Sequence, residues 1–115
     1  MALTGAYTVN CELDTLSGEL FAMLGENFGD AVFPVVLVDQ TCFSGQDSRY
    51  QTDTYQINSY LERGDITVNI HFFQPGPEDT LSVKTAIFPP VSDTSRKARK
   101  IFSALEAVIL RHSAS

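Results

Sequence analysis

The nine residues Asp65–Phe73, DITVNIHFF, decide the fold of this chain. Apolar side chains occupy every second position, and this period of two is typical of a β-strand with one buried face. The positions expected to face the core are Ile66, Val68, Ile70 and Phe72. The positions expected to face the other way are Thr67, Asn69, His71 and Phe73. Strands buried on one face only are typical of antiparallel sheets, so we predict such a sheet.

Further strand-like segments lie on either side of this one. Residues 81–88, LSVKTAIF, alternate in the same way and follow the turn segment QPGPED. Residues 50–61 and 35–43 come before it and are separated by the loop SGQDS. A short strand is also expected within residues 6–13, AYTVNCEL. Because short loops join the last four of these strands, we predict that they form an antiparallel meander.

Two segments change to the period of an α-helix. Residues 14–28 place large apolar side chains on one face, with Phe21 expected in the core, Asp14 as the N-cap and Gly29 as the stop. The second helix is expected to follow the cap residues 92–94. Its apolar stripe consists of Ala98, Ile101, Phe102, Leu105, Val108 and Ile109. Each helix therefore has one face to bury against another layer.

The predicted element order is β-α-β-β-β-β-α. The economical way to bury one face of each element is an α+β two-layer sandwich, with a four- to five-stranded antiparallel meander and both helices on one face. This order resembles that of helix-grip folds and of the small two-layer domains of secretion chaperones, which usually carry a further helix between the strands. The resemblance assigns no residue a role. We expect one domain over residues 1–115, with residues 1–5 and 112–115 frayed.

Composition limits the classes of partner. The net charge of −6 opposes nucleic acid as the main partner, because the phosphate backbone is itself negative. The sequence has no run of about 18 apolar residues, so it predicts no membrane-spanning helix. The N-terminal MALTGAYTVN lacks the basic start and apolar stretch of a secretory signal, so a cytoplasmic location is expected. Cys11 and Cys42 are expected to be small buried residues, and the sequence does not decide whether they form a disulfide.

Charge is unevenly distributed along the chain. Residues 1–95 carry thirteen carboxylates and three cations, whereas residues 96–115 carry five cations and one carboxylate. Four of the cations are Arg96, Lys97, Arg99 and Lys100, in the first turns of the last helix. Cations at a helix N-terminus oppose the helix dipole. Pairing with the acidic body or simple solvation would explain them, and so would a docking site for an acidic partner, a second copy or a phosphate.

The uncovered face of the sheet is the second candidate site. Alternation places Asn69, His71, Phe73, Lys84 and Tyr60 there, with Phe43 as a further aromatic residue. A solvated surface is the plain interpretation, because antiparallel sheets often leave one face to water. Mixed aromatic and polar residues on an exposed sheet also suit a protein-binding surface.

Catalysis and cofactor binding have weaker support in the sequence. No nucleophile motif, phosphate loop or metal-ligand spacing is present, so we expect no enzyme, no cofactor and no metal site. An enzymatic alternative would use His71 as a general base oriented by Asp39. A second alternative is a helix-grip-like domain with a small-ligand pocket between sheet and helices. The leading hypothesis is a non-catalytic interaction module of adaptor, chaperone or inhibitor type, whose partner is a protein or its own copy in a homodimer.

Overall fold

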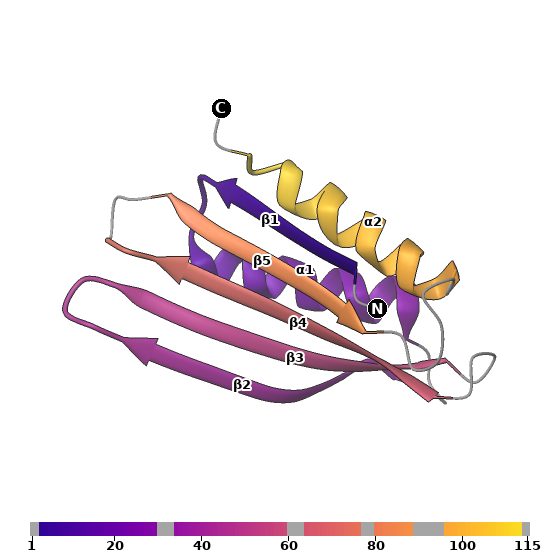
Figure 1. Cartoon of the computed structure of the whole chain (residues 1–115). Coiled ribbons are helices and arrows are strands. Elements are labelled where there is room, and N and C mark those ends of the chain that lie inside the picture. The colour runs from indigo at the N-terminus through magenta and orange to yellow at the C-terminus, as the bar shows by residue number, and fades with distance from the viewer. Residues whose placement is uncertain (1–2, 30–33, 60–63, 77–79, 89–95, 114–115) are drawn as a thin grey trace.

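The predicted order of elements is the observed one. The structure, a computed structural model, describes residues 3–29, 34–59, 64–76, 80–88 and 96–113 (Figure 1). Its elements are β1 (Leu3–Val9), α1 (Leu13–Phe28), β2 (Val36–Ser44), β3 (Arg49–Ser59), β4 (Gly64–Gln74), β5 (Leu81–Phe88) and α2 (Arg96–Leu110). The cap residues 92–94 expected before α2 lie outside the described residues.

The five strands form one antiparallel sheet in the order β1-β5-β4-β3-β2. Strands β2 to β5 are the predicted meander, and β1 completes the sheet beside β5. Both helices lie on the same face of this sheet (Figure 1). The fold is therefore the α+β two-layer sandwich that the hydrophobic periodicity predicts. In the described part of the chain, neither helix is both long enough and apolar enough to cross a membrane.

The core fills the space between the two layers with apolar side chains. The inward residues of β4 are fully buried, as predicted: Ile66, Val68, Ile70 and Phe72. The helices contribute the stripes Leu13, Leu16, Leu20 and Leu24, and Ala98, Ile101, Leu105, Val108 and Ile109. Large buried side chains thus occupy the layer interface that the small-ligand alternative would need for its pocket.

Two predictions about α1 are wrong. Phe21 is 49% exposed, because it lies on the flank of the helix rather than on its buried stripe, although its ring lies near that of Tyr55. The N-cap is Glu12, whose backbone is extended and whose side chain makes no capping bond. Asp14 instead belongs to the first turn and forms an ion pair with Arg49 of β3, at 3.1 Å. Gly29 ends the helix, as predicted.

Of the end segments predicted to fray, residues 1–5 and 112–115, the structure describes residues 3–5, 112 and 113. Leu3, Thr4 and Gly5 belong to β1 and pair with β5. At the other end, the His112 carbonyl accepts a hydrogen bond from the Asn10 amide at 2.8 Å. The Nε2 atom of the His112 ring lies 2.8 Å from a Glu19 carboxylate oxygen. These long-range bonds hold the described residues of both ends on the folded domain.

Tyr7 connects β1 to α2. Its ring lies over Gly5, where a Cβ atom would collide with it, and its hydroxyl donates a hydrogen bond to the Glu106 carboxylate at 2.9 Å. Burial, followed by the hydrogen bond to Glu106, raises the pKa of Tyr7 from 10.0 to about 12. The folded protein therefore holds this proton more tightly than the unfolded chain does.

We expect an ultraviolet absorbance titration to detect this contact. Because the folded pKa of Tyr7 is raised, its contribution to stability is complete below pH 10 and is lost as the pH rises through about 12. The Tyr7→Phe variant should lack one tyrosinate signal in the late, high-pH part of the titration. Tyr55, whose pKa burial also raises, should still titrate late in that variant. Loss of an early signal near pH 10 instead would contradict the assignment.

Candidate partner-binding face of the sheet

The face of the sheet away from the helices, called here the open face, is assembled by strand register. One row across the sheet consists of Phe43, Tyr50, Phe73 and Ser82, and the next of Thr41, Thr52, His71 and Lys84. Directly opposite residues in antiparallel strands lie about 4.5–5.5 Å apart between Cα atoms, so side chains within a row are neighbours. The register therefore brings together residues that are up to about forty positions apart in the sequence.

A shallow depression of about 390 Å³ lies on this face and is the candidate site. Its lining residues are Tyr50, His71, Phe73, Ser82 and Lys84. Three of them, His71, Phe73 and Lys84, are residues predicted for partner binding from the sequence. Its lining residues come from three neighbouring strands, β3, β4 and β5, so the sheet itself forms the depression and no loop is needed for it.

The other residues predicted for this face have separate outcomes. Asn69 is two positions from His71 on β4, and its side-chain oxygen accepts a hydrogen bond from Thr54 at 2.9 Å. Tyr60 lies outside the described residues. Tyr50 was missed, although the alternation of β3 continues back to it from Gln56 through Thr54 and Thr52. Its neighbour across the strand pair is Phe73, and its ring centroid lies 6.2 Å from that of Phe43.

Hydroxyl groups hold the His71 ring. Its Nδ1 atom lies 3.0 Å from the Thr52 Oγ1 atom and 3.3 Å from the Tyr50 hydroxyl oxygen. The Thr52 hydroxyl also donates a hydrogen bond to the Tyr50 oxygen, at 3.0 Å. Because each hydroxyl has one proton and Nδ1 is either a donor or an acceptor, two of these three contacts can be hydrogen bonds at the same time, and they restrict the rotation of the imidazole ring that lines the depression.

The His71–Asp39 pair that the enzymatic alternative requires is not formed. Asp39 lies on β2 and pairs with Thr54, whereas His71 lies on β4 and pairs with Thr52. One full strand, β3, separates the two side chains, and they also occupy different rows. A carboxylate that orients a histidine must be within hydrogen-bond distance of the ring, and this register prevents that contact.

The open face carries very few negative charges for so acidic a protein. The chain has fourteen carboxylate side chains and a net charge of −6. On the open face, among the residues whose side chains the structure describes, Asp39 is the one carboxylate. The other described side chains of the face are uncharged, apart from the exposed Lys84. Other carboxylates whose side chains the structure describes lie away from this face, including Glu12, Asp14, Glu19 and Glu26 around α1.

The basic cluster is a separate site. Arg96, Lys97, Arg99 and Lys100 occupy the first two turns of α2, as predicted, and α2 packs on the opposite face of the sheet from the depression. Arg96, Arg99 and Lys100 are exposed, whereas Lys97 is partly buried. The residues predicted for partner binding thus fall on two sides of the protein rather than on one continuous surface.

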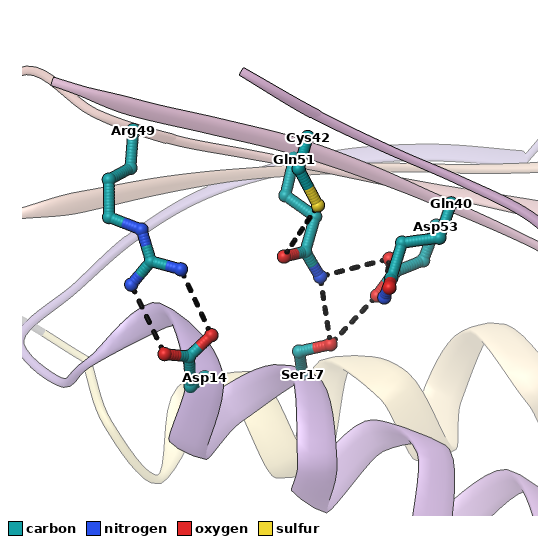
Figure 2. A network of polar contacts seen from close by, with 7 residues as sticks. All are labelled: Asp14, Ser17, Gln40, Cys42, Arg49, Gln51 and Asp53. Carbon is teal, nitrogen blue, oxygen red and sulfur yellow. Dashed lines mark hydrogen bonds and ion pairs between the residues drawn. The ribbon is translucent and has the colours of Figure 1, made fainter. Parts of the chain in front are cut away.

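A polar network beneath α1 was not predicted (Figure 2). Asp53 of β3 is fully buried, and its carboxylate accepts hydrogen bonds from the Ser17 hydroxyl at 2.8 Å and from the Gln40 and Gln51 amides at 2.8 and 3.0 Å. Gln51 is also buried, and its amide donates a second bond to Ser17 at 3.1 Å. The sequence could have predicted their burial, since Gln51 and Asp53 stand at every second position before the inward Tyr55 and Ile57 and so share their face of β3.

The cysteines differ from the expectation of two buried residues. Cys42 is exposed on β2, and its Sγ atom lies 3.5 Å from the Gln51 side-chain oxygen. Cys11 is half-buried. Both are free thiols, so the disulfide that the sequence left open is not formed.

Comparison with known proteins gives a structural likeness and no family. No protein-family profile matches the chain, and no curated protein matches it. A solved structure of a protein from Nitrosospira multiformis, determined as a structural genomics target, is similar at 11% sequence identity with a TM-score of 0.48. The alignment covers 99% of this chain and 97% of that one.

Proposed function

We propose that this protein is a small interaction module that binds a protein partner on its open face and catalyses no reaction itself. One observation carries the proposal: the register gathers aromatic side chains around a depression on a face whose described side chains include one carboxylate. Exposed aromatic residues grouped beside polar ones are the composition of protein-binding surfaces rather than of solvated ones. An adaptor, a chaperone or an inhibitor would each use such a face.

The exposed aromatic area supports this function. Phe43 is 64% exposed, Phe73 is 44% exposed and Tyr50 is 37% exposed, and their register and ring contacts make them neighbours. Exposed rings held in place by a sheet lose little conformational freedom on binding, so their burial contributes strongly to affinity. The free thiols of Cys11 and Cys42 suit the reducing cytoplasm as the place where the module acts.

A second copy of the chain is the alternative partner. The acidic residues around α1 and the basic cluster at the start of α2 are complementary in charge, as a self-association surface would require. Size-exclusion chromatography with light scattering, at low and high salt, separates the cases. A dimer that dissociates in salt indicates contact through the basic cluster, whereas a salt-insensitive dimer indicates the aromatic open face.

The binding test compares two phenylalanines of similar exposure on opposite faces. We expect the Phe73→Ala variant to lose its partner in a quantitative pull-down, with affinity lowered about 30-fold, because central aromatic contacts are typically worth 2 kcal/mol or more. Phe21→Ala, on α1 and 49% exposed, is the matched control and should retain the partner. Unchanged partners and an unchanged oligomeric state in Phe73→Ala would refute the proposed function.

A further inference from the structure

We infer that the segment bound on the open face is acidic, with a carboxylate that pairs with Lys84 and an apolar side chain that packs on Phe73. This inference rests on the proposed function and adds the chemistry of the partner to it. The occupant is a segment of another protein. Its argument has three parts: an exposed cation at the depression, the distribution of carboxylates on the chain, and the spacing of the two contacts.

Lys84 is positioned to receive an anion. It is exposed, it lines the depression, and it lies directly opposite His71 in the register. Among the described residues Lys84 forms no ion pair within the chain, and Asp39, the one carboxylate of its face among the described side chains, lies on β2. Three strand spacings separate β2 from β5, which amounts to about 14 Å. Asp39 is therefore too distant to neutralise Lys84.

A hydrogen-bond donor lies near this cation. Ser82 precedes Lys84 by two positions on the same face of β5 and also lines the depression. A carboxylate bound beside Lys84 would have the Ser82 hydroxyl as a donor for its second oxygen, which makes the contact stronger than a single exposed ion pair.

The charge distribution excludes the other classes of segment. A basic segment would be repelled by Lys84 and would favour the acidic surroundings of α1. A purely apolar segment would cover Lys84 and leave its charge desolvated without a partner. Nucleic acid needs several cations along its backbone, and the described part of this face supplies one lysine. An acidic segment is attracted by Lys84 on the open face. On the surface around α1 the carboxylates of this chain would repel it.

The spacing of the two contacts specifies a short pattern. Lys84 and Phe73 are diagonal neighbours, because Lys84 lies opposite His71 and Phe73 lies opposite Ser82. Diagonal neighbours on adjacent strands are about 7–8 Å apart. Side chains two positions apart in an extended segment are separated by about 6.8 Å and point to the same side. A carboxylate two residues from an aromatic side chain therefore fits both contacts.

The test uses the isotope-labelled full chain and three blocked peptides, followed by amide chemical shifts. One peptide carries Glu two residues before Phe, and the other two carry Gln or Lys in place of Glu. We expect the Glu peptide to shift amides of β3, β4 and β5 around the depression, and to bind about fivefold more tightly than the Gln peptide. Lys84→Gln should abolish this preference, whereas Lys100→Gln, in the basic cluster, should retain it.

The outcomes separate this inference from the proposed function. Equal binding of all three peptides at the depression would overturn the acidic specificity and leave the open face as a binding site. No binding of the Glu peptide, or a preference that persists in Lys84→Gln, would also overturn the inference, while the Phe73→Ala pull-down decides the proposed function independently. Tighter binding of a short single-stranded oligonucleotide at the same amides would replace the acidic segment by nucleic acid.

Discussion

Replacing Phe72 by alanine should lower the free energy of unfolding by about 3–5 kcal/mol, the usual cost of removing a buried aromatic side chain from a packed core. Phe72 has no exposed surface. It lies on β4, the middle strand of the sheet, between Gln51 of β3 and Val83 of β5, and its side chain points toward the helices. Because the ring is surrounded by other side chains, the structure can close only part of the cavity that its removal leaves.

The adjacent residue provides the control. Phe73 points the other way and is 44% exposed, so Phe73→Ala should cost less than about 1 kcal/mol of stability. Urea denaturation followed by far-ultraviolet circular dichroism measures both variants. Two neighbouring phenylalanines would then have opposite roles, with Phe72 needed for folding and Phe73 for binding. Similar losses of stability in the two variants would contradict the assignment of faces.

Replacing Asp53 by alanine should have the second largest effect, a loss of about 2–3 kcal/mol. The substitution removes the acceptor of three hydrogen bonds below α1 (Figure 2). Of the three donors, the Gln51 amide is buried and the Ser17 hydroxyl is half-buried, whereas the exposed Gln40 amide can bond to water instead. The cost comes mainly from Gln51 and Ser17, because a donor shielded from water loses more when its bond is removed than the bond itself contributes. The same denaturation experiment measures the loss.

Two variants test whether this cost comes from the network. Asp53→Asn keeps the shape but turns one acceptor into a donor, and should lose about 1–2 kcal/mol. Asp39→Ala, an exposed carboxylate on β2, should change stability by less than about 0.5 kcal/mol. If Asp53→Ala were as stable as Asp39→Ala, the network would contribute nothing to the fold.

The network also bears on the open face. Gln51 and Asp53 alternate along β3 with Tyr50 and Thr52, so the contacts below the sheet determine which side chains appear above it. A slip of one residue would turn Tyr50 inward and separate it from His71. The buried network thus helps to hold the depression in register, although none of its members lines it.

The sequence by itself determined the order of the elements and the direction in which most side chains point. Period-two alternation placed Phe72 in the core and Phe73, His71 and Lys84 on the open face, and helical spacing placed the basic cluster in the first turns of α2. These properties follow from the local geometry of the backbone, which repeats every two residues in a strand and every 3.6 in a helix. Local geometry is readable from a short stretch of sequence.

Only the tertiary structure decided which residues meet. The pairing of Tyr50 with Phe73, the gathering of Asp53 with Ser17 and Gln40, and the separation of His71 from Asp39 all depend on strand order and register. Phe21 has the spacing of a core residue, yet it is half-exposed because the rotation of α1 on the sheet directs the leucine stripe inward instead. Such contacts join residues far apart in the chain, and their energy comes from packing whole layers together, which no local pattern specifies.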